Sequence, residues 1–367
     1  MDIIDLTESN PTRAGFTYPA ETVIRALEQE GSLVYEPHPR GLWSARHAVA
    51  GYLEGEGVRV DPDRIYLTAS TSEAYAYLFK LLADPGDAVL IPRPSYPLME
   101  LLAAMEAIHA IPYDLSWTPS AGWHLRKEEL EASYTERCRA LLVINPNNPT
   151  GNFLRRHEWE EITRFCSTHD LAIISDEVFF PYVLPRSRIH DPPVSALALP
   201  QQTLVFALGG FSKALGLPQV KLSWIVSNGP APALREALDR LDVIADTYLS
   251  VGTPVQQAAN ALIAIAGTMQ GAIRTRCQTN LDFLSSVFPA DGNVQLLRPP
   301  AGWYAVLRLP SHFDEGLTAC CLLEEKNVLL HPGYFFDFPG GEHLVVSLLP
   351  QQDRFEEGIR RTAELLC

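Results

Sequence analysis

Lysine is scarce in this chain, and one lysine stands apart from the others in its setting. Lys80, Lys127 and Lys326 lie in amphipathic or charged helical patterns, where a solvated surface role is expected. Lys213 instead follows the apolar run LVFAL and the turn GGFS, which places it at the carboxyl end of a predicted sheet strand, where α/β folds bind ligands. A desolvated lysine amine at such a place can act as a nucleophile or a base. An ordinary turn lysine fits the same position.

Two further polar segments also follow apolar runs. NPNNPTG, residues 145–151, comes after ALLVI, and its prolines together with Gly151 could hold Asn148 rigidly toward a ligand. SDE, residues 175–177, comes after LAII and leaves Asp176 at the rim of the predicted sheet. An asparagine-rich loop and a helix-capping aspartate would explain the same letters without any ligand.

The segment TASTSEA, residues 68–74, leads from a predicted strand into a predicted helix. Ser70, Thr71 and Ser72 place hydroxyl groups beside the first free amides of that helix, and helix amino termini bind phosphate through such amides and the aligned peptide dipoles. The same letters also form an N-cap at Ser70 or Thr71 with Glu73 as its capping-box partner, which needs no ligand.

The elements that must position these segments alternate between strands and helices. Short runs rich in Val, Ile and Leu predict strands at 65–68, 88–92, 140–145, 171–176, 204–208 and 222–227, with helices such as 72–83 and 157–168 between them. This alternation is typical of βα units around a mostly parallel sheet. The predicted fold class is therefore α/β, with a large domain whose sheet is flanked by helices.

The rest of the chain predicts a second domain. The pattern is helical from about 231 to 290, and a long helix there would connect two domains. Beyond it, strands at 294–297, 303–309, 328–331 and 343–348 and helices at 315–325 and 354–366 predict a smaller α+β C-terminal domain. We expect an N-terminal arm at 1–25 that packs on the small domain, a large domain at 26–250, and the small domain at 251–367.

Composition limits the function classes. A chain of 367 residues with 47% hydrophobic content can bury a large core, and a formal net charge of −15 opposes binding to nucleic acid or to an anionic membrane surface. The six cysteines form no CxxC pair and no zinc-ligand spacing, so we expect no metal site and buried thiols in a reducing compartment. The start MDIIDLTESNPT has no signal-peptide pattern, and no window reaches the ~18 apolar residues of a membrane span. These features predict a cytoplasmic protein.

Taken together, the segments gain a meaning that none has alone. The order TASTSEA, DPGDAVLIPRPSYP, NPNNPTG, SDEVF, FSKALGLPQVKLSW and HPG resembles the fold type I pyridoxal 5'-phosphate (PLP) enzymes of the class I/II aminotransferase family, over nearly the whole chain. The resemblance implies that the large domain binds PLP and that Lys213 forms the internal aldimine and then moves the proton between substrate and cofactor. Asp176 would pair with the pyridine nitrogen and keep it protonated, so that the ring acts as an electron sink.

The resemblance assigns the remaining cofactor contacts as well. Asn148 would hydrogen-bond the 3' oxygen, and Tyr96, in RPSYP, would stack on the ring. The phosphate contacts would be Ser70, Thr71, Ser72 and Ser212. Tyr35, in VYEPHPRGL, resembles the tyrosine that family members send to the phosphate of the neighbouring subunit, which implies a homodimer.

Four positions depart from the family pattern. Phe179 stands where a tyrosine commonly donates to the 3' oxygen, which predicts a less acidic internal aldimine. Gly210 replaces the first serine of the SxSK pattern. Lys221 replaces the phosphate arginine eight residues past Lys213, which keeps the charge but loses the two-pronged geometry. Val345, in LVVSLLP, replaces the arginine that usually binds the α-carboxylate of the substrate.

The substitution at Val345 leaves substrate binding open. Either another cation serves, or the substrate carries no α-carboxylate in the usual place. Arg13, in NPTRAGF, and Arg40, in PRGL, are the candidate substitutes, although both also fit surface residues, and the position of the amino-terminal segment favours Arg13. An aromatic set could line an apolar substrate pocket or belong to the core; its members are Trp303, Tyr304, Tyr334, Phe335 and Phe336.

The resemblance predicts a PLP-dependent aminotransferase that transfers an amino group between an amino acid, or a related amine, and a 2-oxo acid through Lys213. A PLP lyase or decarboxylase acting on an amino acid uses the same lysine and aspartate and is the alternative, which Val345 and Phe179 favour. A PLP-binding protein without catalysis is a third hypothesis, and the retention of Lys213, Asp176 and Asn148 argues against it.

Overall fold

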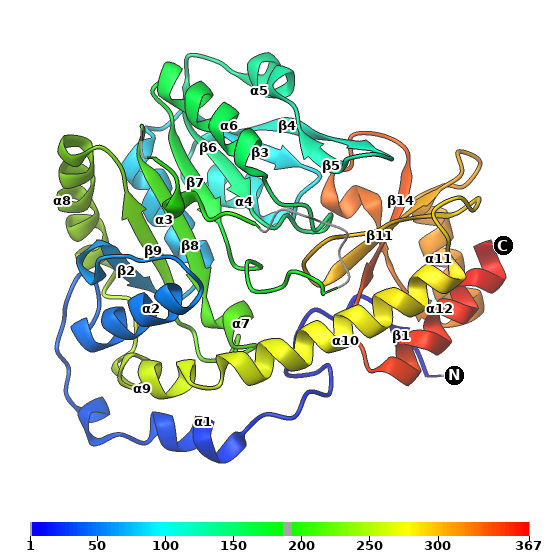
Figure 1. Cartoon of the computed structure of the whole chain (residues 1–367), viewed down its shortest axis with the longest axis horizontal. Coiled ribbons are helices and arrows are strands. Elements are labelled where there is room, and N and C mark those ends of the chain that lie inside the picture. Colours follow the sequence, from blue (N-terminus) through cyan, green and yellow to red (C-terminus); the bar gives the residue numbers. More distant parts are fainter. Residues whose placement is uncertain (1, 186–192, 201, 367) are drawn as a thin grey trace.

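The computed structural model describes residues 2–185, 193–200 and 202–366, and a large sheet organises most of this part of the chain (Figure 1). In spatial order its strands are β2 (Ile65–Thr68), β9 (Ser223–Asn228), β8 (Val205–Gly210), β7 (Ala172–Asp176), β6 (Cys138–Ile144), β3 (Ala88–Arg93), β4 (His109–Thr118) and β5 (Gly122–Leu125). All six strands predicted for the large domain are present, within two residues at each end. The pair β4 and β5 was not predicted.

The strand directions bring several chain segments to one edge of this sheet. Strands β8, β7, β6, β3 and β4 run parallel to their neighbours in that row. Strand β9 is antiparallel to both β8 and β2, so β2 points the same way as β8. The carboxyl ends of β2, β3, β6, β7 and β8 therefore lie at the same edge, together with the amino end of β9. The predicted mostly parallel sheet is confirmed.

Helices cover both faces of the large sheet, because its central strands are apolar on both sides. Helices α3 (Thr71–Leu82), α4 (Leu98–Met105) and α8 (Ala231–Tyr248) share a core with one face. The other face packs on α6 (Arg156–Thr168) with α5 (Lys127–Ser133), and further along on α2 (Trp43–Gly55) and α9 (Thr253–Ile263). This three-layer arrangement is the predicted α/β architecture.

The small domain is built on a four-stranded antiparallel sheet. Its order is β10 (Gln295–Leu297), β11 (Tyr304–Leu309), β14 (Glu342–Ser347) and β13 (His331–Pro332). Helices α11 (Glu315–Lys326) and α12 (Gln352–Leu366) pack on it, as Figure 1 shows at the red end of the chain. The predicted smaller α+β domain is thus present.

The amino-terminal segment and one long helix connect the two parts. Strand β1 (Ile4–Asp5) pairs in parallel with β12 (Val328–Leu329), so the start of the chain packs on the small domain. Helix α1 (Ala20–Leu27) instead packs against α9, which shares the large-domain core. Helix α10 (Ala266–Val287), the long yellow helix of Figure 1, extends from that core into the core of the small domain. The proposed boundaries at 25 and 250 stay predictions.

Short 3-10 turns complete the described elements: η1 (Glu30–Leu33), η2 (Pro62–Arg64), η3 (Ala196–Ala198) and η4 (Gly333–Phe336). The expectation of buried thiols is right for Cys138, Cys166 and Cys277 and wrong for Cys320, which is exposed on α11 because that helix has one solvent-facing side. Cys321 is half-buried, and Cys367 lies outside the described residues.

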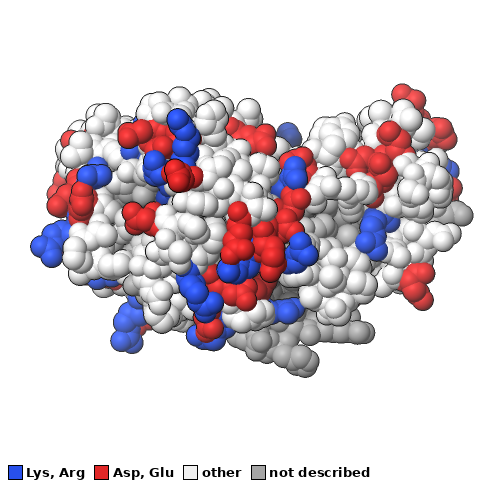
Figure 2. Space-filling view, turned by 90° about the horizontal axis from the view of Figure 1, so that it is seen from above, with Lys and Arg blue, Asp and Glu red and all other residues white. Residues whose placement is uncertain are grey.

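Charge is spread over the surface. On the face that Figure 2 shows, acidic and basic side chains are intermixed, with acidic ones gathered near its centre, in keeping with 44 acidic against 29 basic residues in the whole sequence. Within the described part of the chain, no helix has both the length and the apolar character that crossing a membrane requires.

Candidate active site

The carboxyl edge of the large sheet carries most of the residues that the sequence singled out. Lys213 lies in α7 (Phe211–Ala214), directly after β8, and Asp176 is the last residue of β7. Asn148 follows β6, and Tyr96 follows β3. The segment from Ser70 to Ser72 follows β2 at the other side of Lys213. Because these strands share one direction, the fold brings all five segments to one edge.

Asp176 is a buried carboxylate with two hydrogen-bond donors. Its side chain is 6% exposed; Oδ2 accepts the Tyr75 hydroxyl at 2.7 Å and Oδ1 accepts the Val178 amide at 3.1 Å. Burial raises the pKa of Asp176, while the Tyr75 hydroxyl, the Val178 amide and the charge of Lys213 oppose that rise. Tyr75 was not predicted as a site residue, because it lies on the buried face of the α3 pattern and looks like core.

The Lys213 amine lies against two aromatic rings. Its Nζ is 4.9 Å from the centroid of the Trp303 ring and 5.5 Å from that of Phe179, and these two rings meet edge to face at 5.3 Å. The Lys213 carbonyl accepts the Tyr182 hydroxyl at 2.6 Å, which ties the lysine backbone to the segment after Asp176. A lysine amine over such rings gains cation–π attraction when it is charged.

Burial nevertheless favours the neutral amine. It lowers the pKa of Lys213 from 10.5 to about 8, and the charge of Asp176 opposes that shift. A lysine whose amine loses its proton near neutral pH can attack a carbonyl carbon and can carry a proton afterwards. Burial and a lowered pKa therefore separate Lys213 from an ordinary solvated turn lysine.

Hydrogen bonds and a close backbone approach hold several residues of the NPNNPTG turn in place. Asn147 Nδ2 donates to the Pro94 carbonyl at 3.1 Å and to the Thr150 hydroxyl at 2.6 Å. Gly151 has φ +69°, and a Cβ there would lie 2.2 Å from the Ala301 carbonyl oxygen, so only glycine fits. Two side-chain oxygens of the turn, Asn147 Oδ1 and Asn148 Oδ1, are buried without a hydrogen-bond partner in the described structure. A buried amide in that state fits a polar group on a ligand.

The TASTSEA segment forms the N-cap of the alternative interpretation, but Glu73 binds the amide before the cap instead of closing a reciprocal capping box. Ser70 is the N-cap of α3: its Oγ accepts the Glu73 amide at 3.2 Å, and Glu73 Oε2 accepts the Ala69 amide at 2.7 Å. The Ser70 hydroxyl is therefore already used as a cap. Among the described residues, the structure gives no hydrogen bond to the Thr71 or Ser72 hydroxyl, so both can serve a phosphate beside the free amides of the first turn.

The other two phosphate candidates, Ser212 and Lys221, lie on the chain between β8 and β9. Ser212 lies in α7, next to Lys213, and Lys221 lies exposed just before β9 with φ +59°. The structure also explains Gly210, the departure from the SxSK pattern: a Cβ there would lie 2.3 Å from Ser223 Oγ. A serine at this position would require the Ser223 side chain to move.

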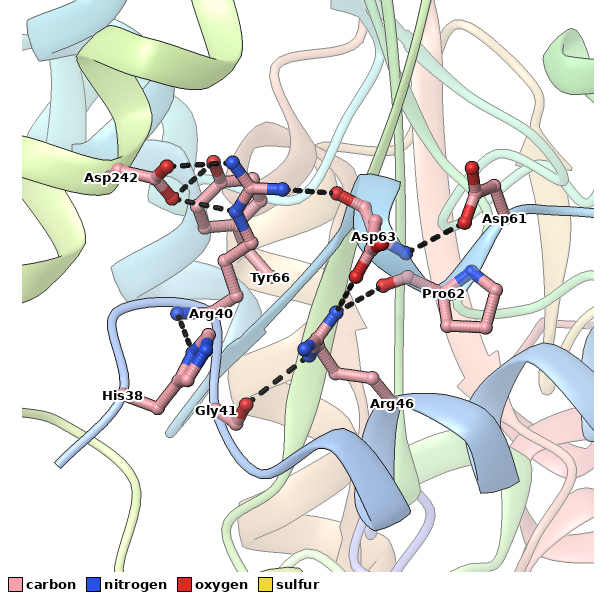
Figure 3. A network of polar contacts seen from close by, with 9 residues as sticks. All are labelled: His38, Arg40, Gly41, Arg46, Asp61, Pro62, Asp63, Tyr66 and Asp242. Carbon is pink, nitrogen blue, oxygen red and sulfur yellow. Dashed lines mark hydrogen bonds and ion pairs between the residues drawn. The ribbon is translucent and has the colours of Figure 1, made fainter. Parts of the chain in front are cut away.

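Arg40 is held by the large domain itself (Figure 3). Its guanidinium donates to both oxygens of Asp242, at 2.7 and 2.6 Å, and to the Asp63 carbonyl at 2.6 Å, and it stacks 5.3 Å over the Tyr66 ring. All three nitrogens of the Arg40 guanidinium, Nε, Nη1 and Nη2, thus donate a hydrogen bond within the large domain. The structure therefore does not favour Arg40 as a substitute carboxylate-binding residue.

Three more predicted positions are placed as follows. Val345 is fully buried in β14, opposite Val306 of β11 and His331 of β13. Arg13 is exposed on the amino-terminal segment, and Tyr35 is 69% exposed after η1. The sequence alone could not show whether Val345 faces a core or a cavity, since both patterns are apolar. Among the described residues, no group of three or more His, Cys, Asp or Glu side chains could hold a metal ion.

A sheet of this topology with a buried lysine and a buried aspartate at its carboxyl edge, next to a small antiparallel domain, has the fold type I architecture, and solved structures agree. An alanine aminotransferase from Pyrococcus furiosus superposes with a TM-score of 0.89 at 23% identity, covering 100% of this chain and 92% of that one. An aminotransferase from Escherichia coli superposes with a TM-score of 0.86 at 24% identity, covering 100% and 91%. At these identities the likeness shows the fold.

Sequence comparison gives the family. The model of aminotransferase class I and II matches residues 1–355. The glutamate-pyruvate aminotransferase AlaA of Haemophilus influenzae is 26% identical over 99% of this chain and 90% of its own length. An alanine aminotransferase of Mycobacterium tuberculosis is 27% identical over 99% and 85%. The chain belongs to the class I and II aminotransferase family and is a PLP-dependent transaminase.

Proposed function

We propose that this enzyme transfers an amino group between an amino acid and a 2-oxo acid, with Lys213 as the covalent anchor of PLP. The observation that supports this most is the pairing of a lysine whose pKa is lowered to about 8 with a buried carboxylate at the same sheet edge. Strongly shifted groups of this kind concentrate at catalytic sites. The unpartnered Asn148 Oδ1 supports a ligand at the same place.

The residues present fit the cofactor. PLP, when bound, withdraws electrons from the α-carbon of the substrate and makes its C–H bond acidic. Asp176, held in place by Tyr75, keeps a proton on the ring nitrogen through its negative charge. Asn148 would bind the 3' oxygen, Tyr96 would lie over the ring, and Lys213 Nζ would accept and give back the proton that moves between substrate and cofactor.

The phosphate is bound where a helix begins. Thr71, Ser72 and the first amides of α3 supply donors, and Ser70 contributes chiefly by capping that helix. Ser212 adds a hydroxyl and Lys221 adds a charge without a fork. Tyr35, 69% exposed, binds the phosphate of a second copy, so the active form is a homodimer.

The α-carboxylate of the substrate needs a cation elsewhere, because the position of the family arginine is occupied by Val345. Arg13 is exposed and, within the described part of the chain, forms no ion pair, so its guanidinium is available for this role. Relatives named as alanine and glutamate-pyruvate aminotransferases make glutamate and pyruvate the first pair to test.

A comparison of two lysine variants tests the proposal. Purified protein with PLP is assayed for amino transfer from a panel of amino acids to pyruvate or 2-oxoglutarate. We expect transfer by the native enzyme, none by Lys213→Ala, and native rates from Lys127→Ala, whose side chain pairs with Glu131 on the surface of α5. Transfer that survives in Lys213→Ala would overturn the proposal. Ammonia or carbon dioxide released without any 2-oxo acid would support the lyase or decarboxylase that Val345 and Phe179 favour.

A further inference from the structure

The amino-terminal segment places a carboxylate against the small-domain sheet. Ser347 Oγ donates to the Glu8 carbonyl at 2.5 Å, and the Ser347 amide donates to the Leu6 carbonyl at 2.8 Å. Ser347 lies directly opposite Tyr304 in the pairing of β14 with β11. Glu8 is therefore held next to Tyr304 by two strands of the small domain.

Tyr304 in turn connects Glu8 to the lysine and to the aromatic ring expected over the cofactor. Trp303, the preceding residue, is the ring that lies 4.9 Å from Lys213 Nζ. Tyr304 also packs on Phe336 with ring centroids 6.4 Å apart, and the Phe336 carbonyl accepts the amide of Ser95, the residue before Tyr96, at 2.9 Å. The Tyr304 hydroxyl interacts electrostatically with both the Glu8 carboxylate and Tyr96, so the carboxylate lies at the same side of the site as Tyr96.

The Glu8 carboxylate has no cation of its own. Its Oε1 accepts the Asn10 amide at 2.8 Å, and its side chain is half-buried. Across residues 2–185, 193–200 and 202–366, no ion pair includes Glu8. The nearest strand of the small sheet offers none either, because the position that would carry the family arginine is the buried Val345.

The other basic groups in this region either bind other partners or have a disfavoured charged form. Arg276 donates to the Ala14 and Leu349 carbonyls and stacks on Phe16. His331, which faces β14, has its pKa lowered by burial, with Asp5 opposing, and is neutral at pH 7. A carboxylate without a counter-charge can bind the cationic group of a ligand through charge-assisted hydrogen bonds.

Exposed aromatic rings lie on the Tyr96 loop and on η4, which a backbone hydrogen bond joins. Tyr96 is 47% exposed, and Tyr334 and Phe335 of η4 are 59% and 45% exposed, just before the Phe336 carbonyl that holds the Tyr96 loop. Aromatic faces attract guanidinium and ammonium groups, and a carboxylate binds them with charge-assisted hydrogen bonds. A neutral or acidic side chain would leave Glu8 unpaired or repelled.

We propose that the amino-acid substrate carries a side chain that ends in a guanidinium or ammonium group, and that Glu8 binds this group. The proposal rests on the proposed function, since it names the substrate class of the same site. The α-carboxylate then has no arginine at position 345, and Arg13 on the same segment as Glu8 binds it. Both ends of the substrate are recognised by the amino-terminal segment.

Matched pairs of amino acids test the charge directly. Holoenzyme is titrated, without a 2-oxo acid, with arginine against citrulline, lysine against norleucine and ornithine against norvaline, and the change in cofactor absorbance gives the affinity of each. We expect the charged member of at least one pair to bind about tenfold or more tightly, as a charge-assisted hydrogen bond allows. Glu8→Gln should remove that preference and leave the neutral members unchanged. Glu131→Gln, on the surface of α5, should keep the native preference.

The outcomes separate the two proposals. If neutral or acidic amino acids bind as tightly as their charged partners, or if Glu8→Gln keeps the preference, the substrate class is wrong while the amino transfer stands. If no amine in the panel changes the absorbance of the cofactor, the proposed function itself fails. Circular dichroism and cofactor content of Glu8→Gln are measured alongside, and an unfolded variant is replaced by Glu8→Ala for the same test.

Discussion

The hydroxyl of Tyr75 offers a way to change Asp176 without touching the carboxylate. It donates to Asp176 Oδ2 at 2.7 Å inside the core and is one of the two hydrogen bonds that keep the pKa of this buried carboxyl from rising further. A hydrogen bond to a charged group is worth about 1.5–3 kcal/mol, which corresponds to about 1–2 pKa units. Tyr75→Phe should therefore raise the pKa of Asp176 by about that amount, since the ionised form loses its partner.

The sign of this change determines what is measured. A carboxylate with a raised pKa becomes neutral at a higher pH, so the negative charge that binds the protonated ring nitrogen is lost earlier as pH falls. The affinity of the apoprotein for PLP, followed by equilibrium dialysis from about pH 5 to about pH 9, should begin to fall about 1–2 pH units higher in Tyr75→Phe than in the native protein.

Tyr113→Phe is the matched control. The Tyr113 hydroxyl is equally buried and donates to the neutral Leu142 carbonyl at 2.8 Å, so its loss costs stability without changing a charge. Tyr113→Phe should lose about 0.5–1.5 kcal/mol of unfolding free energy, and Tyr75→Phe about 1.5–3 kcal/mol. The reasoning is refuted if the pH profile for PLP binding is the same in Tyr75→Phe as in Tyr113→Phe.

Three further changes test other parts of the structure. Phe179→Tyr should lower the pKa of the Lys213 nitrogen in its bond to the cofactor, because a phenol there donates to the 3' oxygen; an absorbance titration that shows a rise would count against this. Gly151→Ala should destabilise the protein by about 1–3 kcal/mol, since φ is +69° and the new Cβ meets a carbonyl oxygen at 2.2 Å, whereas Gly271→Ala, in the open middle of α10, should be neutral or stabilising in thermal unfolding. Arg40→Met should lower the unfolding free energy by about 1–3 kcal/mol with an unchanged KM for the amino acid, while Arg13→Met should raise that KM; the opposite pattern would restore Arg40 as the substrate residue.

The sequence predicted the strands of the large sheet well because they are apolar on both faces and bounded by turn residues. It did not predict β4 and β5, which lie at one edge of the sheet, are mostly half-buried and include Pro112. Edge strands carry a weaker pattern, since one side meets solvent. It also could not show that α9 packs with α2, because these two helices are far apart in the chain and no local pattern reveals their contact.

The site divides in the same way. Lys213, Asp176 and Asn148 could be predicted because their motifs are continuous in the sequence and follow strands. Tyr75 and Glu8 could not, because each acquires its role from a partner far along the chain: Tyr75 lies 101 residues from Asp176, and Glu8 lies 339 residues from Ser347. Such partners are set by packing of whole elements.

The central claim is that Lys213 forms the covalent bond to PLP, and one measurement tests it most directly. Holoenzyme is reduced with borohydride, which fixes the cofactor on the lysine that holds it, and the digested protein is analysed by mass spectrometry. The chain has only five lysines, Lys80, Lys127, Lys213, Lys221 and Lys326, so the assignment is unambiguous. We predict that the reduced cofactor is found on Lys213; its stoichiometric recovery on any other lysine, or on none, would contradict the account.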